Sequence, residues 1–322
     1  MLAERVLQGD RRAIARAISL VENGDPVMGE IVRVLYPSTG GAMRVGLTGP
    51  PGVGKSSLIS ALITECRRSG LSVGVVSVDP SSPFTQGAVL GDRIRLGEHF
   101  LDRDVFIRSM GTRGHLGGLA RATLQAALIL DAAGKQVVFL ETVGVGQSEI
   151  EIASIADTVV LALMPGSGDS IQALKAGVME IPDIIVVNKK DHPAAEVTLN
   201  EIRSILALDE RRAGWDSPLL ATNALSGEGA AELWAAVTQH HAYLEQTGLL
   251  AARRGENLQK EVVALATCEM QRWLLGRADR DPRLAAVMQR VREQELDPLS
   301  AVRAILVEVF GISEADLDAD GR

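Results

Sequence analysis

Residues 49–56 have the sequence GPPGVGKS, a glycine-rich stretch that fits the pattern G-x-x-x-x-G-K-[ST]. The apolar run at 44–48 predicts a strand before it, and apolar residues at helical spacing from 58 to 63 predict a helix after it. In this position, successive backbone N–H groups can point at a polyphosphate that lies on the helix N-terminus. The stretch therefore predicts a phosphate-binding loop between a strand and a helix.

The residues of this loop have separate expected roles. The Lys55 ammonium is expected to reach the β- and γ-phosphates, and the Ser56 hydroxyl is expected to bind Mg²⁺. An accidental glycine-rich turn is the alternative, and the strand and helix predicted on its two sides argue against it. The predicted nucleotide contacts in this region are Gly49, Pro50, Pro51, Gly52, Val53, Gly54, Lys55, Ser56 and Ser57.

Short apolar runs alternate with helical patterns over the middle of the chain. Strands interleaved with helices indicate a mostly parallel sheet with helices on both faces. The sequence therefore predicts an α/β fold around the phosphate-binding loop. The seven predicted strands are residues 44–48, 72–78, 104–108, 136–140, 158–163, 183–187 and 218–222.

Both ends of the chain have helical patterns. Residues 1–36 have apolar residues at helical spacing, with a break at 23–26. After residue 226 no strand candidate remains, and three amphipathic stretches follow, near 230–250, 256–275 and 282–310, with breaks at Gly248 and Pro298. The expected domains are a helical N-terminal arm at 1–40, a P-loop nucleotide-binding domain at 41–248 and a helical dimerisation region at 249–322.

The composition excludes several classes of protein. The chain has 322 residues, 46% of them hydrophobic and 23% charged, which is the balance of a globular protein rather than a fibrous or disordered one. A net charge of −8 and 3% aromatic residues argue against binding to nucleic acid or anionic membranes. The longest apolar run, 158–164, is too short to span a bilayer. Cys66 and Cys268 predict neither a disulfide framework nor a zinc site, so we expect a cytoplasmic protein.

A second motif follows the sixth predicted strand. Residues 188–191 are NKKD, which fits the N-K-x-D pattern of GTPases. The Asp191 carboxylate can accept hydrogen bonds from both guanine N1–H and N2–H₂, whereas adenine has no matching pair of donors. Lys189 is expected to lie along the base plane, and Asn188 to brace the neighbouring loops. A polar helix cap is the alternative, but ligands bind at this end of parallel strands, so we expect GTP rather than ATP.

Three carboxylates are candidate ligands or water-orienting groups for Mg²⁺. Glu141 ends the fourth predicted strand and is followed three residues later by Gly144, the arrangement in which a GTPase holds Mg²⁺, although Asp is commoner than Glu there. Asp79 follows the second strand, and Asp92 lies in the sequence GDR. For Asp79 and Asp92, a helix cap or turn remains an alternative.

Several motifs together closely resemble the MeaB/ArgK family of GTPases, the chaperones of methylmalonyl-CoA mutase, which are similar to the human methylmalonic aciduria type A protein. The resemblance covers nearly the whole chain. It is carried by the phosphate loop, N-K-x-D, and the sequences VDPSS at 78–82, GDRIR at 91–95, RGHLGGL at 113–119 and ETVGVGQSE at 141–149.

The resemblance implies a homodimeric GTPase that binds GTP or GDP with Mg²⁺. It also implies docking on an adenosylcobalamin-dependent acyl-CoA mutase, with methylmalonyl-CoA mutase as the first candidate and ethylmalonyl- and isobutyryl-CoA mutases as alternatives. The GTPase would gate transfer of adenosylcobalamin and protect or reactivate the mutase. By the same likeness, 92–108 is switch I, 141–149 is switch II, and 166–175 is a third mobile loop.

One position departs from the family pattern. In residues 221–226, ATNALS, the usual Ser-Ala pair appears as Asn223-Ala224. The guanine O6 contact then falls to the backbone of Ala224 and Leu225, and the role of Asn223 itself stays open.

Catalysis is expected to depend on Lys55, Glu141 with Mg²⁺, and an oriented water. Gln147 is the candidate for orienting that water, and the alternative is that it faces the mutase. Arg108 and Arg113 are candidates for a transition-state cation or for surface contacts only, and His115 is expected in a turn or the core. No catalytic base is evident, so we expect slow intrinsic hydrolysis that a partner accelerates.

Three other functions compete with this interpretation. An ATP-dependent transport or kinase accessory protein is disfavoured by the N-K-x-D motif. A nickel-insertion GTPase would need a His-rich tract or a Cys/His cluster, and the five histidines include only one adjacent pair, His240 and His241. A structural protein with an inactive nucleotide site is excluded if GTP is hydrolysed.

Overall fold

The computed structural model describes residues 1–79, 96–111, 118–141, 155–166, 182–207, 214–278 and 280–319. The chain divides into two compact units, Met1–Lys260 and Glu261–Arg322. The first unit contains the sheet and the predicted phosphate-binding loop, and the second is helical in its described part.

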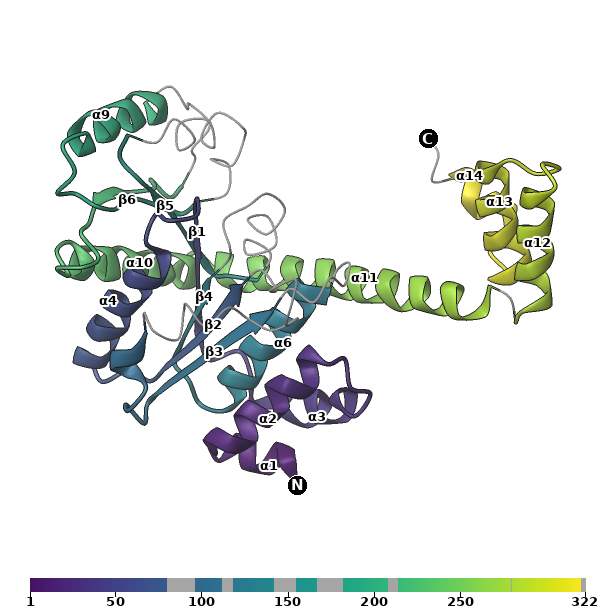
Figure 1. Cartoon of the computed structure of the whole chain (residues 1–322), viewed down its shortest axis with the longest axis horizontal. Helices are drawn as coiled ribbons and strands as arrows, with labels where there is room; N and C mark the ends of the chain where they lie inside the picture. Colours follow the sequence, from purple (N-terminus) through teal and green to yellow (C-terminus); the bar gives the residue numbers. More distant parts are fainter. Residues whose placement is uncertain are drawn as a thin grey trace. The chain divides into compact units, whose positions relative to one another are not determined.

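A seven-stranded sheet forms the centre of the first unit within the described residues (Figure 1). All neighbouring strands are parallel, in the order β3-β2-β4-β1-β5-β6-β7. The predicted parallel α/β fold is confirmed. The strands are β1 (Met43–Thr48), β2 (Val73–Asp79), β3 (Val105–Gly111), β4 (Val137–Glu141), β5 (Thr158–Leu163), β6 (Ile184–Val187) and β7 (Leu219–Ala221).

All seven predicted strands occur, with small shifts of their ends. β3 differs most, because it continues beyond the predicted end at 108 to Gly111. Its last residues pair with the end of β2, in the register Val78↔Met110 and Asp79↔Gly111. The apolar pattern stops at Ser109, so pairing with the neighbouring strand, rather than side-chain type, determines this end.

Helices cover both faces of the sheet, as predicted. They are α4 (Lys55–Arg68), α6 (Gly118–Ala132), α9 (Ala195–Leu206) and α10 (Ala230–Gln246). α4 and α10 share a core with one face, whereas α6 and α9 pack on the other. Side chains of β4 alternate between these layers, because Val137 and Phe139 lie in the core of α4 while Val138 and Leu140 lie in that of α6. β1 lies in the middle of the sheet, so the loop that follows it is held by buried structure.

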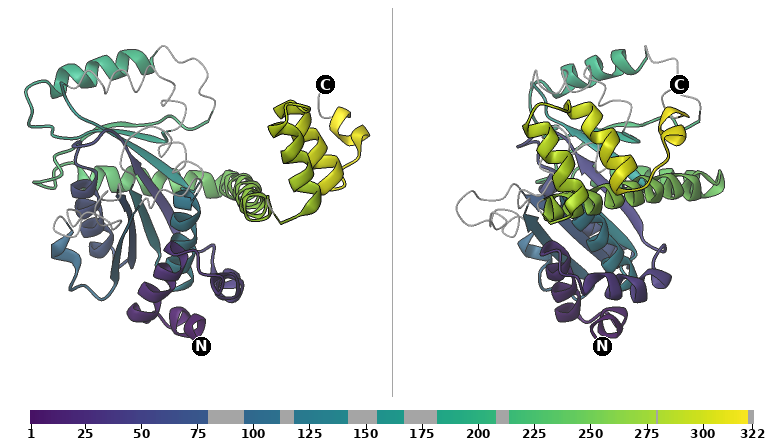
Figure 2. Two further views of the ribbon diagram at one scale, coloured as in Figure 1. Left: turned by 45° about the vertical axis from the view of Figure 1, so that its right-hand side comes forward. Right: turned by 90° about the vertical axis from the view of Figure 1, so that its right-hand side faces the viewer.

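The N-terminal helices pack against α6 and share its core (Figures 1 and 2). They are α1 (Leu2–Leu7), α2 (Arg11–Glu22) and α3 (Met28–Leu35), followed by the 3₁₀ turn η1 (Tyr36–Ser38). The predicted break at 23–26 is confirmed, and a second break precedes α2. There Gly9 has φ +74° and the Asp10 carboxylate accepts hydrogen bonds from the N–H groups of Arg12 and Ala13. Sequence spacing missed this break because Val6 and Ile14 are also correctly spaced for one continuous helix.

Arg108 belongs to the contact between this arm and the sheet. It lies on β3, and its guanidinium donates hydrogen bonds to Ser19 Oγ at 2.9 Å and to the Glu22 carboxylate on α2. Both side chains of the ion pair are largely buried. The structure shows neither of the two roles considered for Arg108; the side chain forms an internal ion pair with the N-terminal arm.

The second unit consists of helices in its described part. α11 (Leu249–Arg277) begins in the first unit and continues across Lys260, and it is followed by α12 (Pro282–Arg292), α13 (Pro298–Ala304), the π-helix η4 (Ile305–Val309) and α14 (Glu314–Ala319). The predicted break at Pro298 is confirmed, because α13 starts there and the Asp297 carboxylate accepts hydrogen bonds from the N–H groups of Leu299 and Ser300. Leu284 and Val287 of α12 are fully buried, and Trp273 of α11 packs on Phe310 with 5.3 Å between ring centroids.

Cys66 and Cys268 are free thiols, and burial raises the pKa of Cys66 to about 12, so that thiol stays protonated at neutral pH. Among the described ranges, no group of three or more His, Cys, Asp or Glu side chains is placed to hold a metal ion. None of the described helices combines the length and the apolar character that crossing a bilayer requires.

Two arginines at the start of α11 bind the amino-terminal edge of the sheet, opposite to the phosphate-binding loop. Arg254 donates to both oxygens of Asp157, at 2.8 and 2.6 Å, and to two backbone carbonyls before β1. Arg253 donates to both oxygens of Asp183, at 2.9 and 3.0 Å. Asp157 and Asp183 directly precede β5 and β6, so this arginine anchor (Asp157, Asp183, Arg253 and Arg254) fixes the start of α11 to the sheet.

His240 is buried beside the arginine anchor and makes the stability of the first unit depend on pH. Its ring is 1% exposed, contacts Thr158 Oγ1 at 2.8 Å and lies 3.3 Å from Asp183 Oδ1. Burial lowers the pKa of His240 to about 4, despite the nearby Asp183 and Asp157 carboxylates; Arg253 and His241 act in the same direction as burial. The unfolded chain therefore takes up a proton between pH 6.5 and 4 that the folded protein does not.

We expect the free energy of unfolding to fall by about 3 kcal/mol as the pH is lowered through this window. Urea unfolding at a series of pH values measures this loss. The control is His240→Gln, which keeps a polar side chain but does not titrate, so its stability should change less between pH 6.5 and 4. An identical pH profile in the variant would contradict the assignment to His240.

Candidate functional site

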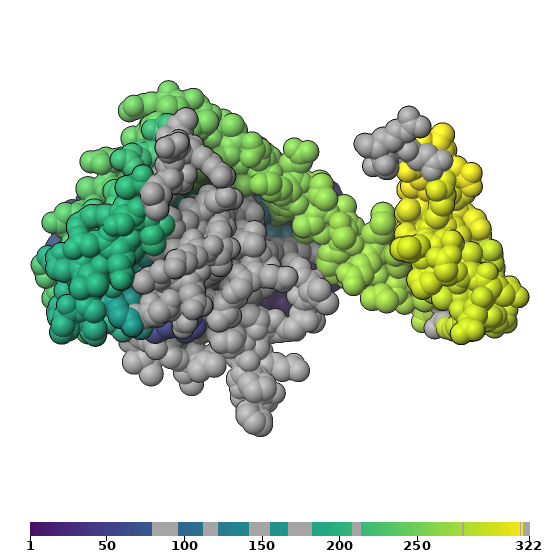
Figure 3. Space-filling view, turned by 90° about the horizontal axis from the view of Figure 1, so that it is seen from above, coloured from purple at the N-terminus to yellow at the C-terminus, as the bar shows by residue number. Residues whose placement is uncertain are grey.

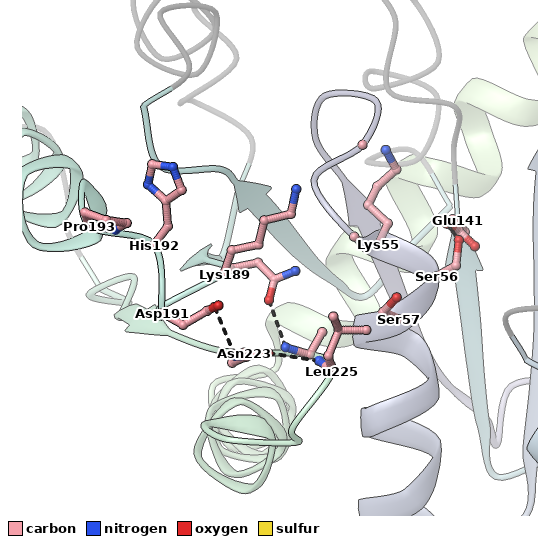
Figure 4. Close-up of a pocket in the computed structure, with 14 residues that line it drawn as sticks. Lys55, Ser56, Ser57, Glu141, Lys189, Asp191, His192, Pro193, Asn223 and Leu225 are labelled. Atoms are coloured by element: carbon pink, nitrogen blue, oxygen red, sulfur yellow. Dashed lines mark hydrogen bonds between the residues drawn. The ribbon is translucent and has the colours of Figure 1, made fainter.

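The carboxyl ends of β1, β4, β6 and β7 meet at one edge of the sheet, around a cavity of about 520 Å³ (Figure 4). The loops that follow these strands contain the residues predicted for phosphate, ion and base binding. The cavity is lined by Gly52, Gly54, Lys55, Ser56, Ser57, Glu141, Asn188, Lys189, Asp191, His192, Pro193, Asn223, Ala224 and Leu225. The structure therefore brings the two main sequence motifs together in one site.

Two glycines of the phosphate-binding loop make close approaches that no other residue allows. Gly49 has φ +135°, and a Cβ there would lie 2.1 Å from the carbonyl oxygen of Ala162 on β5. Gly54 has φ +97° and caps the start of α4, and a Cβ there would lie 2.5 Å from Asn188 Nδ2. The loop is therefore held tightly between β5 and the loop after β6.

Lys55 is the first residue of α4 and is 7% exposed. Its ammonium donates hydrogen bonds to the carbonyl oxygens of Gly49, at 2.7 Å, and Pro50, at 3.1 Å. The side chain thus curls back over the loop, next to the N-terminus of α4, where the helix dipole favours an anion. A buried ammonium and a helix N-terminus at one end of a cavity are groups that can bind a phosphate.

Ser56 and Glu141 form the part of the site that fits a hard cation. The Ser56 hydroxyl donates to Glu141 Oε1 at 2.7 Å, and Ser77 on β2 donates to Glu141 Oε2 at 2.9 Å. Glu141 is 6% exposed, and both of its oxygens are oriented by these hydroxyls. A hydroxyl and a carboxylate side by side are oxygen donors of the kind that Mg²⁺ takes from a protein, with water and phosphate oxygens as its further ligands. The residues present therefore fit Mg²⁺.

Asn188 connects three loops around the cavity. Its Nδ2 donates to the carbonyl oxygen of Val53 at 2.8 Å, and its Oδ1 accepts from Thr222 Oγ1 at 3.1 Å and from the N–H of Ala224 at 3.0 Å. The side chain is 2% exposed, so these bonds are shielded from water. Asn188 thereby fixes the distance between the phosphate-binding loop and the loops after β6 and β7.

Lys189 and Asp191 lie at the end of the cavity away from Lys55 (Figure 4). Lys189 has φ +59°, and its ammonium lies 3.0 Å from Met164 Sδ after β5. Asp191 is exposed, and its Oδ1 accepts a hydrogen bond from Asn223 Nδ2 at 2.9 Å. Leu225, on the loop after β7, lines the cavity with a side chain that is 91% exposed. This end of the cavity offers an acceptor carboxylate and exposed apolar groups for a planar base.

Some predicted site residues have supporting positions or fall outside the described residues. Gly49, Pro50 and Val53 do not line the cavity but accept hydrogen bonds through their carbonyl oxygens. Pro51 is exposed beside them. Asp79 ends β2, but its side chain lies outside what the structure describes. Asp92, Arg113, His115 and Gln147 also lie outside the described residues. So do residues 92–95 of the segment expected as switch I, all of switch II after Glu141, and all of the third loop after Gly166.

Sequence reasoning missed two residues that line the cavity, His192 and Pro193. They directly follow the N-K-x-D motif, and the chain turns there, since the N–H of His192 donates to the carbonyl oxygen of Lys189 at 2.9 Å. Their position next to Asp191 was the available signal, but neither residue type is specific for a nucleotide.

Comparisons with known proteins identify the family of the chain and several of its relatives. The family model described as "Methylmalonyl Co-A mutase-associated GTPase MeaB" matches residues 14–277. The chain is 47% identical over 313 residues to a protein of Pyrococcus abyssi named as a candidate GTPase, covering 96% of each chain. It is 34% identical over 270 residues to the mitochondrial methylmalonic aciduria type A homolog of Mus musculus, covering 77% of this chain and 64% of that one. The crystal structure titled as that of a LAO/AO transport system kinase has a TM-score of 0.71 at 28% identity, covering 97% of each chain.

Proposed function

The chain belongs to the MeaB family of methylmalonyl-CoA mutase-associated GTPases, and from that premise we propose that it is a GTP-hydrolysing chaperone of an adenosylcobalamin-dependent acyl-CoA mutase. In this proposal, GTP binding and hydrolysis gate the loading of adenosylcobalamin and protect or reactivate the mutase. Methylmalonyl-CoA mutase is the partner we propose first, because the family model is described as methylmalonyl-CoA mutase-associated and the mouse relative is named a methylmalonic aciduria type A homolog.

A single observation carries the nucleotide part of the proposal: one cavity has a phosphate-type site at one end and the N-K-x-D carboxylate at the other. We propose that Lys55 and the N-terminus of α4 bind the β- and γ-phosphates. Asp191 then accepts the N1–H and N2–H₂ groups of guanine, and Lys189 and Leu225 contact the faces of the base. The backbone of Ala224 and Leu225 donates to guanine O6.

Hydrolysis in this proposal depends on positioning rather than on a strong base. Ser56 and Glu141 would hold Mg²⁺, which neutralises negative charge on the phosphate oxygens. Lys55 holds the terminal phosphates in place on the loop. Gln147 remains the candidate for orienting the attacking water. We therefore expect slow hydrolysis until a partner completes the site.

The proposed quaternary state is a homodimer that uses α11. No described side chain of this 29-residue helix is buried, and the helix lies at the surface (Figure 3). In the second unit it exposes Val262, Val263, Met270 and Leu275, by 46 to 74%. A long helix with such side chains is typical of one that packs on a second copy.

The proposal is tested by measuring GTP hydrolysis and cofactor loading with purified proteins. Alone, the protein should turn over GTP far below about 10 per second, the typical enzyme rate, and methylmalonyl-CoA mutase should accelerate it. Loading of adenosylcobalamin into the mutase should need GTP and fail with a non-hydrolysable analogue. The same measurements with ethylmalonyl- and isobutyryl-CoA mutases identify which mutase is the partner.

Two outcomes would contradict the proposal. Turnover near 10 per second without any mutase would remove the case for a partner-controlled switch. Equal competition by ATP would instead favour the ATP-dependent accessory role considered from the sequence.

A further inference from the structure

We propose that Asn223 is a positioning residue that orients the Asp191 carboxylate for the purine base and so determines how strictly guanine is selected. The inference rests on the proposed function, since it requires Asp191 to contact the base. It starts from one contact across the mouth of the cavity: Asn223 Nδ2, on the loop after β7, donates to Asp191 Oδ1, on the loop after β6, at 2.9 Å (Figure 4).

The orientation of the Asn223 amide is dictated by the backbone. Its Oδ1 accepts hydrogen bonds from the N–H of Leu225, at 3.1 Å, and of Ser226, at 3.3 Å. Backbone N–H groups can only donate, so the amide oxygen must face them. The NH₂ group is then forced to face Asp191, and a flipped amide would lose all three bonds.

The loop that carries Asn223 is itself tied to the loop of Asp191. The N–H of Asn223 donates to the carbonyl oxygen of Glu228 at 2.9 Å, which closes the loop as a small hairpin. Lys190, next to Asp191, forms an ion pair with the Glu228 carboxylate at 2.6 Å. Asn223 therefore binds Asp191 from a loop whose hydrogen bonds are already formed before a purine base binds.

This arrangement matters because Asp191 is exposed. A free carboxylate at the surface would have to be ordered when the base binds, at a cost in affinity. The bond from Asn223 occupies only one lone pair of Oδ1, so both carboxylate oxygens can still accept from guanine N1–H and N2–H₂. The Asn223 amide oxygen can accept hydrogen bonds from the turn while its nitrogen donates to the Asp191 carboxylate. This explains how Asn can replace the usual Ser at this position.

Two substitutions separate the bond to Asp191 from the support of the turn. Asn223→Asp has the same shape and keeps an oxygen for the two backbone N–H groups, but it replaces the donor with a second carboxylate. Asn223→Ser keeps a hydroxyl donor. Binding of GDP and of IDP, which lacks the N2 amino group, is measured for each variant by calorimetry. Asp191→Asn, measured with GDP and ADP, tests the base contact itself.

We expect Asn223→Asp to lower the ratio of GDP to IDP affinity by about tenfold or more at pH 7.5, because the two carboxylates repel each other. Part of the loss should be recovered at pH 5, where one of them binds a proton. In Asn223→Ser, the ratio of GDP to IDP affinity should stay within about threefold of that of the wild type. This change is smaller than the loss of one charge-assisted hydrogen bond would cause. In GTP turnover, Asn223→Asp should raise KM and leave kcat unchanged.

An unchanged GDP-to-IDP ratio in Asn223→Asp would overturn the inference. Equal weakening of GDP and IDP would do so too, because it would indicate only a damaged turn. If Asp191→Asn relaxes the preference for GDP over ADP while Asn223→Asp has no effect, the inference about Asn223 fails alone. If Asp191→Asn also leaves that preference unchanged, the proposed guanine site fails as well.

Discussion

Replacing Lys55 with alanine is expected to weaken binding of GDP and of a non-hydrolysable GTP analogue by at least about 100-fold, and with it to abolish GTP turnover. Charge-assisted hydrogen bonds contribute about 1.5–3 kcal/mol each, and the proposed site assigns Lys55 two phosphates, so the loss reaches about 3–6 kcal/mol. The effect is large also because Lys55 is buried and holds the carbonyl oxygens of Gly49 and Pro50. Its removal loosens the loop that presents the backbone N–H groups.

Calorimetry with the two nucleotides measures this effect, and circular dichroism checks that the variant is folded. Lys260→Ala is the matched control, because it removes the same type of side chain from an exposed position on α11 and should bind like the wild type. Lys55→Arg should not restore binding, since a planar guanidinium does not fit where a compact ammonium lies on the loop. Binding by Lys55→Ala within about threefold of the wild type would show that this loop is not the phosphate site.

The strands were predictable because their signal is local. In a parallel sheet covered on both faces, a strand is a continuous apolar run, and such runs in this chain are bounded by polar or glycine-rich segments. The break before α2 was not predictable from apolar spacing, because it depends on one backbone conformation at Gly9 and one cap at Asp10. Local patterns therefore identify which elements exist better than where they end.

The candidate site was predictable where a motif requires particular residue types. Lys55, Ser56 and Asp191 come from short patterns whose chemistry is specific, and the structure places all three on one cavity. The contact of Asn223 with Asp191 joins residues 32 positions apart and is not a property of either motif. His192 was missed for a different reason: it directly follows the N-K-x-D motif and lines the cavity, but a histidine is not specific for a nucleotide.

The arginine anchor could not be predicted from sequence either, because its partners are about 70 to 100 residues apart. Asp157 and Asp183 appear in the sequence only as polar residues before apolar runs, where a turn would also place them. Arg253 and Arg254 appear in the sequence as one of four adjacent arginine pairs. The sheet brings the two carboxylates side by side, because each directly precedes one of two adjacent parallel strands, β5 and β6.

Breaking this anchor should have the largest effect on stability among substitutions outside the site. Arg254→Ala leaves the Asp157 carboxylate, which is 1% exposed, without the guanidinium that binds both of its oxygens. Removing one partner of a buried ion pair costs about 3–5 kcal/mol, because the remaining charge stays in a low-dielectric environment. The two backbone carbonyls before β1 that accept from Arg254 also lose a donor.

Urea unfolding followed by tryptophan fluorescence measures the loss, since Trp215 donates a hydrogen bond to the backbone of Asp183 and so reports on this region. Arg272→Ala is the control, because it breaks an exposed pair with Glu269 on the same helix and should cost less than about 1 kcal/mol. The double variant Asp157→Asn with Arg254→Leu removes both charges, so it should recover part of the stability lost in Arg254→Ala. If Arg254→Ala were no more destabilised than Arg272→Ala, the bonds from Arg254 to Asp157 would not contribute to holding the start of α11. Nucleotide binding should be unchanged in all three variants, because the anchor lies at the opposite edge of the sheet from the cavity.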